Sequence, residues 1–265
     1  MDSPRKVVVR GREYRVHESG RADADGASTV LLHGIGMTHR SFARVQEAMP
    51  AGHRVLNLDL AGFGRSPAPR RGLSVEQYAA DLAEVLARVD AWPAVVAGHS
   101  MGTQFAVELA RIRPAEALGV ALIGPVVDPA RRTLPQQAAD LARDTVGEPP
   151  SVNALVLGDY VRAGVRWYLK ELGAMMDYPM LQRIRESSAE VAVIRGERDP
   201  IARERWCRRL VAASGGLAEL VTIPGEHHVV PRTAPTVVAR ELVRLAERVD
   251  GRLPDVAPTP RAAAG

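Results

Sequence analysis

The sequence of 265 residues lacks most features of membrane, secreted or disulfide-bonded proteins. Its single cysteine, Cys207, excludes an internal disulfide and lies in a charged helical stretch, where we expect a packing role rather than a reactive thiol. No apolar run approaches the roughly 20 residues that a transmembrane helix needs. The segment from Met1 to Lys6 lacks the apolar core of a secretory signal, so we expect a cytoplasmic protein.

Lysine is almost absent: of the 35 lysine and arginine residues, only Lys6 and Lys170 are lysines. The isoelectric point is near 9.6, yet the net charge is only +4 and the arginines are interspersed with acidic residues. No basic stripe with interleaved aromatic residues is present, so we expect no nucleic-acid partner. The apolar fraction of 46% is typical of an ordinary globular protein. The only partner we expect is a small-molecule substrate, which follows from the function predicted below. The sequence indicates no particular oligomeric state.

A strand-turn-helix pattern surrounds Ser100. The apolar run 94–97 predicts a strand, the run 103–110 predicts a helix, and Gly-His-Ser-Met-Gly from Gly98 to Gly102 joins them. In such a turn the glycines allow close backbone packing, and the serine oxygen stands clear of the sheet near a helix N-terminus, which favours developing negative charge. The alternative is a tight turn with an inert serine; the strand-turn-helix context favours a nucleophile.

Strands and helices alternate along most of the chain. This alternation favours an α/β fold whose mostly parallel sheet is covered by helices on both faces. We expect Ser41 to cap one helix, and Ser74 with Gln77 to form the capping box of another. The expected strands are 6–10, 12–16, 29–32, 53–58, 94–97, 117–123, 189–195 and 218–223, and the expected helices outside residues 126–188 are 41–49, 74–89, 103 to about 114, 200–213 and 231–249.

The segment 126–188 interrupts the alternation, because only helical patterns occur in it. It lies between two expected strands, so we expect it to form a helical cap over the C-terminal edge of the sheet, where α/β sheets bind ligands. We therefore expect a core domain of residues 1–125 and 189–249, a cap of residues 126–188, and a flexible tail of residues 250–265 that is rich in proline and alanine.

A nucleophilic serine needs a base, and the base needs an orienting carboxylate. In this type of turn the chain order is serine, acid, histidine. Asp199 follows an expected strand, at the same edge of the sheet as the turn that carries Ser100. Glu197 is the weaker candidate for the acid. Asp199 could also cap the expected helix that begins at Pro200. His227 and His228 follow the last expected strand, and their positions alone do not decide between them. A metal site at this histidine pair is disfavoured, because adjacent histidines point in different directions.

Two backbone N–H groups are expected to hold the developing oxyanion. Met101 directly follows the nucleophile, and Ile35 lies in the glycine-rich loop after the strand 29–32. His33, in the same loop, and His99, beside the nucleophile, are more readily explained as structural residues. We expect Asp59 to be a turn and packing residue.

The remaining histidines and glycines suggest no further chemistry. His17, His39 and His53 have no partners at an informative spacing. The glycine-rich segment from Gly62 to Ser66 lacks the Gly-Lys-Ser/Thr of a phosphate-binding loop. We therefore expect no nucleotide, no metal and no other cofactor.

Together these motifs resemble those of the α/β-hydrolase superfamily over residues 7–249. The resemblance implies an eight-stranded, mostly parallel sheet with an inserted helical cap. It also favours His228 as the base, because family members often have a proline seven residues after that histidine, as Pro235 is here. His227 stands where the family usually has a small residue. The motifs that carry the resemblance are His33-Gly34-Ile35-Gly36, the segment from Asp59 to Ser66, the segment from Gly98 to Gly102, the segment from Gly196 to Asp199, and Pro224-Gly225 with the two histidines.

The sequence predicts a serine hydrolase, which cleaves an ester or related acyl bond in a medium-sized hydrophobic molecule. Aromatic and methionine residues in the cap could line an adaptable apolar pocket, although packing of the cap explains most of them. Carbon–carbon bond hydrolysis or a lyase reaction with the same residues is one alternative, and a non-catalytic small-molecule binding protein is another. The expected pocket residues are Gly34, His99, Trp167, Met175 and His227.

Overall fold

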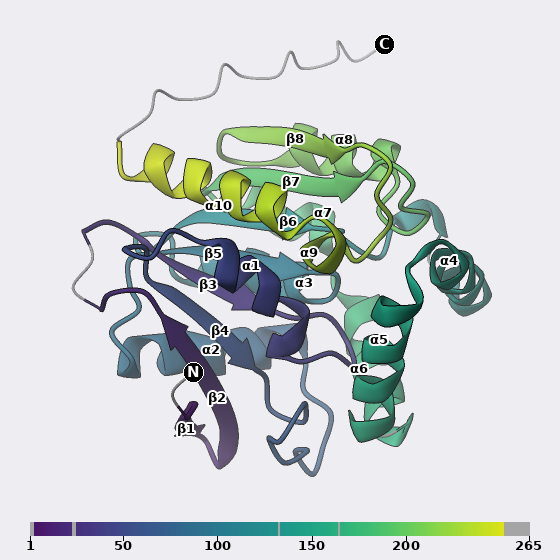
Figure 1. Ribbon diagram of the computed structural model, residues 1–265, viewed down its shortest axis with the longest axis horizontal. Helices are drawn as coiled ribbons and strands as arrows, with labels where there is room; N and C mark the ends of the chain where they lie inside the picture. The colour runs from purple at the N-terminus through teal and green to yellow at the C-terminus, as the bar shows by residue number, and fades with distance from the viewer. Residues whose placement is uncertain (1–2, 23–24, 132, 164, 252–265) are drawn as a thin grey trace.

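The computed structural model describes residues 3–22, 25–131, 133–163 and 165–251, and its centre is one eight-stranded sheet (Figure 1). The strand order is β1-β2-β4-β3-β5-β6-β7-β8; β2 pairs antiparallel with β1 and β4, and all other pairs are parallel. This confirms the expected fold class. The strands are β1 (Arg5–Val9), β2 (Arg12–Ser19), β3 (Ser28–Leu32), β4 (Val55–Asp59), β5 (Ala94–His99), β6 (Ala117–Ile123), β7 (Glu190–Gly196) and β8 (Ala218–Ile223).

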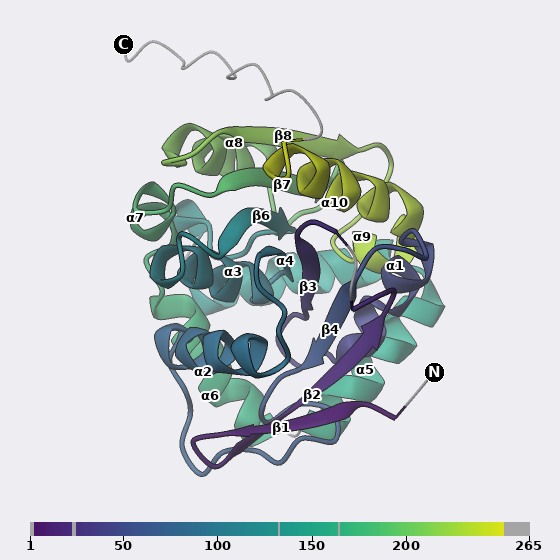
Figure 2. The same cartoon turned by 90° about the vertical axis from the view of Figure 1, so that its left-hand side faces the viewer.

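Two layers of helices cover the sheet, and each layer has its own apolar core. Figure 2 shows α2, α3 and α8 on one side of the strands and α1 with α10 on the other. Because both faces are covered, every residue of β3, β4 and β5 is buried. The helices of the two layers are α1 (Ala43–Ala48), α2 (Val75–Arg88), α3 (Gly102–Ile112), α8 (Glu204–Ala213), α9 (Val230–Thr233) and α10 (Pro235–Val249).

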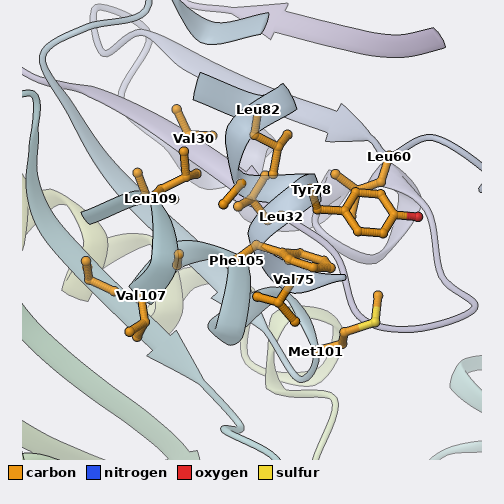
Figure 3. Close-up of a cluster of buried hydrophobic side chains, with 14 of the residues drawn as sticks. Val30, Leu32, Leu60, Val75, Tyr78, Leu82, Met101, Phe105, Val107 and Leu109 are labelled. Carbon is orange, nitrogen blue, oxygen red and sulfur yellow. The ribbon is translucent and has the colours of Figure 1, made fainter. Parts of the chain in front are cut away.

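The core beneath the predicted nucleophile brings together residues of β3, α2 and α3. In Figure 3 the Met101 side chain points into the same apolar cluster as Phe105 and Tyr78. The rings of Tyr78 and Phe105 lie 4.9 Å apart, and the Tyr78 hydroxyl donates to the Ala61 carbonyl oxygen at 2.8 Å. The Met101 side chain is therefore part of the apolar core, with 1% of its surface exposed.

Helix boundaries differ from the expected ones at three places. Ser41 does not cap a helix, because it lies in a 3₁₀ turn (His39–Ser41) that Thr38 caps. The Ser41 hydroxyl donates to the Thr38 carbonyl oxygen, and α1 begins only at Ala43. The expected helix 200–213 begins at Glu204 instead. The expected helix 231–249 is two helices, because the residue before Pro235 cannot easily adopt the helical conformation.

The capping box of α2 forms as predicted. The Gln77 N–H donates to the Ser74 hydroxyl at 3.3 Å, and the Ser74 N–H donates to the Gln77 side-chain oxygen at 3.0 Å. These two bonds satisfy amides that a helix start otherwise leaves without acceptors.

Between β6 and β7 the described chain is helical, as expected for residues 126–188. The helices α4, α5 and α6, here called the helical insertion, lie together beside the sheet (Figure 1). The short α7 packs instead against α3 and α8. The elements are a 3₁₀ turn (Pro129–Arg131), α4 (Leu134–Gly147), α5 (Pro150–Ala163), α6 (Val165–Asp177) and α7 (Met180–Arg185).

None of the described helices is long and apolar enough to span a membrane. Of the expected tail, 250–265, residues 252–265 lie outside the described residues.

Candidate active site

Ser100 lies on a sharp turn between β5 and α3. Its φ angle is +56°, in the left-handed region that non-glycine residues rarely adopt. The Ser100 N–H donates to the Ile123 carbonyl oxygen at 2.9 Å, and the Thr103 N–H donates to the Ser100 carbonyl oxygen at 3.0 Å. These bonds hold the strained backbone at the carboxyl end of β5, where the serine is 8% exposed.

The flanking glycines make this turn possible. A Cβ on Gly98 would lie 2.1 Å from the Gly102 carbonyl oxygen, and a Cβ on Gly102 would lie 2.2 Å from the Leu32 carbonyl oxygen. A Cβ on Gly34 would lie 3.0 Å from the Ser100 Cβ, so the loop after β3 packs directly against the serine. The sequence pattern at residues 98–102 therefore has a steric cause.

Asp199 and His228 form a buried pair. His228 Nδ1 lies 2.8 Å from Asp199 Oδ2, and the other carboxylate oxygen accepts from the Ile201 and Ala202 N–H groups at 2.7 and 2.8 Å. Asp199 therefore braces the turn before α8 and also orients the histidine. Glu197, the competing acid, accepts from the Gly225 N–H instead.

Asp199 and His228 shift each other's pKa values in opposite directions. Burial alone would raise the pKa of Asp199, but the charge and hydrogen bond of His228 outweigh it and lower that pKa. Burial would lower the pKa of His228, but the charge and hydrogen bond of Asp199, followed by the charges of Asp144 and Glu148, raise it above its usual value. An ionised Asp199 fixes the proton on Nδ1 and leaves Nε2 as the atom available to a nucleophile.

His228 lies close to the end of β5 that carries Ser100. The His99 and His228 ring centroids are 5.0 Å apart, and His99 Nε2–H donates to the His228 carbonyl oxygen at 3.1 Å. A Cβ on Gly124, just after β6, would lie 3.0 Å from His228 Cε1. Among the described residues, the Ser100 hydroxyl makes no hydrogen bond to His228. Catalytic hydrogen bonds are often longer before substrate binds, so the juxtaposition remains compatible with proton transfer.

The two other histidines near the serine have structural surroundings. Burial lowers the pKa of His99 to about 3, so its ring is neutral. His33 Nε2 accepts from the Leu60 N–H at 3.2 Å, and Nδ1–H donates to the Gly34 carbonyl oxygen at 2.8 Å. His33 thereby links the loop after β3 to the loop after β4.

The two amides predicted for the oxyanion flank Ser100. Ile35 belongs to the loop that touches the serine through Gly34, and Met101 is the residue before α3. Within the described part of the chain, neither N–H donates a hydrogen bond to a protein acceptor. An N–H at a helix start that lacks an acceptor favours an anion.

The other expected pocket residues occupy different surroundings. The Trp167 indole packs against Gly62 and makes an edge contact with Phe63 at 6.4 Å. Met175 lies in the core between the insertion and α3, and its carbonyl oxygen accepts from the Gln104 side chain at 2.8 Å. His227 lines a cavity of about 570 Å³ on the Asp199 side, together with arginines of α4 and of the loop before α8.

Sequence reasoning missed two acidic residues at the C-terminal end of α4, Asp144 in the helix and Glu148 directly after it. Asp144 Oδ1 accepts from the His228 N–H at 3.0 Å, and Glu148 Oε1 accepts from the Val229 N–H at 2.7 Å. Asp144 lies in the last turn of α4, and Glu148 is the extended residue that ends the helix, four positions later. The sequence contains no pattern that links these two acidic residues to the loop of His228, which lies more than 80 residues further along the chain.

Sequence reasoning found no partners at an informative spacing for His53, His17 and His39, yet all three have partners. His53 Nε2 lies 2.7 Å from the Thr29 hydroxyl, and His17 and His39 share one carboxylate. Both rings reach the Asp59 carboxylate, at 3.2 and 2.9 Å, and they stack with centroids 3.6 Å apart. The side chains of His17, His39 and Asp59 are close enough to share a metal ion. The near-parallel rings, however, would place an ion out of both imidazole planes, whereas the nitrogen lone pairs lie in those planes. We interpret this cluster as a hydrogen-bonded brace.

The amino-acid sequence is similar to a known protein family and, over part of its length, to several curated proteins. The sequence model described as "Alpha/beta hydrolase family" matches residues 29–241. The chain is 36% identical over 92 residues to a magnesium-chelatase 30 kDa subunit from Rhodobacter capsulatus, a match that covers 34% of this chain and 32% of that protein. The chain thus spans about a third of the length of the first curated relatives it matches.

Solved structures match over almost the whole chain. An enol-lactonase from Burkholderia xenovorans LB400 superposes with a TM-score of 0.78 and 22% identity, over 91% of this chain and 99% of that one. A thermophilic esterase from Thermogutta terrifontis gives a TM-score of 0.77 and 19% identity, over 94% of this chain and 100% of that one. At these identities the likeness establishes the fold.

Proposed function

Because the chain belongs to the alpha/beta hydrolase family, we propose that it is a serine hydrolase with Ser100, His228 and Asp199 as its catalytic triad. The reaction is cleavage of a carboxylic ester or related acyl bond in a medium-sized hydrophobic molecule. The observation that carries the proposal is a strained serine at the end of β5 beside a buried, hydrogen-bonded histidine–aspartate pair.

The reaction proceeds in two stages. His228 Nε2 takes the proton of the Ser100 hydroxyl as the serine oxygen attacks the substrate carbonyl carbon. The imidazolium then gives that proton to the departing alcohol, and the acyl group stays on the serine. Water, deprotonated by His228, releases the acid and restores the serine. Asp199 keeps the imidazole in the productive tautomer and stabilises its charged form.

The N–H groups of Ile35 and Met101 hold the oxyanion of each tetrahedral intermediate. Their support is the absence of a protein acceptor for either amide among the described residues, together with the position of both next to Ser100. Removal of one oxyanion donor typically costs about 10²–10³ in turnover. The mechanism requires neither a metal nor an organic cofactor.

The helical insertion acts as a cap in this proposal and contributes apolar side chains to the substrate pocket. Trp167 and Met175 are candidates from the insertion, and Gly34, His99 and His227 are candidates from the body of the protein. The esterase and the enol-lactonase share the fold and act on acyl compounds by name, which favours ester chemistry over lyase chemistry.

A panel of chromogenic esters tests the function. We expect turnover of esters with medium-sized apolar or aromatic acyl groups, weak turnover of highly charged ones, and no turnover by Ser100→Ala. Preference for charged substrates would refute the assigned substrate class. Turnover of vinylogous diketones or cyanohydrins in place of esters would favour carbon–carbon cleavage or lyase chemistry. Ligand binding without turnover, unaffected by Ser100→Ala, would identify a binding protein.

A further inference from the structure

We propose that Asp144 of α4 and Glu148, the residue that ends this helix, are positioning residues, which hold the loop of His228 by its backbone and set the charge around the imidazole. The inference rests on the proposed function, because it concerns the base of that reaction. It links the helical insertion to the catalytic histidine through two hydrogen bonds.

The two carboxylates hold consecutive amides of one loop. Asp144 accepts from the His228 N–H at 3.0 Å and Glu148 accepts from the Val229 N–H at 2.7 Å. Asp144 is 3% exposed and Glu148 is 6% exposed. A backbone carbonyl or a side-chain amide would satisfy an N–H group without burying a charge, and burying a charge costs free energy. Two carboxylates at this place therefore suggest a role for their charge.

No arginine or lysine neutralises these carboxylates among the described residues. The side chain nearest to Asp144 among its possible ion-pair partners is His227, whose Nδ1 lies 3.9 Å from Asp144 Oδ1. Burial raises the pKa of Asp144, and burial raises the pKa of Glu148 to about 7. Keeping the Asp144 and Glu148 carboxylates ionised therefore costs free energy, and a positive charge on the neighbouring His228 would reduce this cost.

The titratable groups around His228 come from four elements. Asp199 approaches from the loop after β7, neutral His99 from β5, and Asp144 and Glu148 from the C-terminal end of α4. The histidine's own loop adds His227 and Glu226. After Asp199, Asp144 and Glu148 are the groups that raise the pKa of His228 most. When the serine proton moves to the imidazole, its new charge is stabilised by three carboxylates, two of them supplied by the insertion.

The competing explanation is a purely structural latch between the insertion and the loop. Asp144→Asn and Glu148→Gln separate the two explanations, because an amide oxygen still accepts from the backbone N–H but carries no charge. Asp140→Asn is the matched control. Asp140 is a buried carboxylate on the same helix, one turn before Asp144, and it pairs with Arg131 and Arg203 rather than with the histidine loop.

The test measures kcat/KM for a chromogenic ester against pH, which reports the base of the free enzyme. We expect Asp144→Asn to move the acid limb to lower pH by about half a unit, or about threefold in activity on that limb. Glu148→Gln should move the acid limb only in the part of the profile above pH 7, where the wild-type Glu148 carboxylate is ionised. The double variant should shift it further, and Asp140→Asn should leave it in place.

An NMR titration of the imidazole of His228, with its signal assigned by His228→Gln, makes the same measurement without turnover. Unchanged midpoints in Asp144→Asn and Glu148→Gln, or an equal shift in Asp140→Asn, would overturn the inference. If the wild type hydrolyses no ester, the proposed function fails, and the NMR titration still decides whether the two carboxylates act on His228.

Discussion

Replacement of Gly98 by alanine tests the steric account of the nucleophile turn. The new Cβ would lie 2.1 Å from the Gly102 carbonyl oxygen and 2.2 Å from the Gly102 carbonyl carbon. Contacts below 3.0 Å essentially never occur for real Cβ atoms, so β5 and α3 must separate by the difference between 2.1 and 3.0 Å, about 0.9 Å. Both contacts are backbone atoms, so no side-chain rotation relieves them.

The expected cost is about 3 kcal/mol of unfolding free energy, at the upper end of ordinary overpacking. The same displacement moves Ser100, and a shift near 1 Å at a reacting group can lower turnover about 10²-fold. Urea unfolding followed by circular dichroism measures the first effect, and ester hydrolysis at a fixed protein concentration measures the second.

Gly173→Ala is the matched control. Gly173 lies on the exposed side of α6, and a Cβ there would meet no atom within 4 Å. This replacement should stabilise the helix by about 0.5–1 kcal/mol and leave turnover unchanged. A Gly98→Ala protein as stable and as active as the wild type would refute the described packing of the turn.

Three further predictions concern the buried groups. Asp199→Asn should lower kcat about 10⁴-fold in steady-state assays, because Nδ1–H of His228 loses its carboxylate acceptor; retention of near-wild-type kcat would contradict this role. Because the pKa of His228 is raised, its contribution to the free energy of unfolding is present below about pH 6.5 and lost as pH rises through the raised pKa. Thermal unfolding should show this alkaline decline in the wild type and a smaller one in His228→Gln. Burial raises the pKa of the Cys207 thiol to about 12, so a disulfide reagent should label it only after urea unfolds the protein.

Patterns local in the sequence predicted most of the fold. The sequence pattern located all eight strands to within a few residues. The central strands β3, β4 and β5 are buried on both faces, which demands continuous apolar sequence, whereas the partly exposed β1 and β2 show alternation around a glycine turn. Helix starts were less predictable. The start of α1 depends on Thr38, which caps a preceding turn, and the start of α8 depends on amides that Asp199 binds for a tertiary reason.

The candidate site was predictable where chemistry imposes a motif. Gly98 and Gly102 are required by the close approach of β5, α3 and β3, so they appear in the sequence as a pattern. Asp144 and Glu148 were not predictable, because their partners are backbone N–H groups, which any residue can supply. The contact of His17 and His39 with Asp59 was missed for a related reason: it joins residues of separate elements at no fixed spacing.

The most direct test of the triad is a fluorophosphonate reaction followed by peptide mass spectrometry. The account predicts one covalent adduct, on the Ser100 hydroxyl of the folded protein, that disappears in Ser100→Ala and forms far more slowly in His228→Gln. A folded wild-type protein that acquires no adduct on Ser100, or an adduct formed at an equal rate without His228, would contradict it.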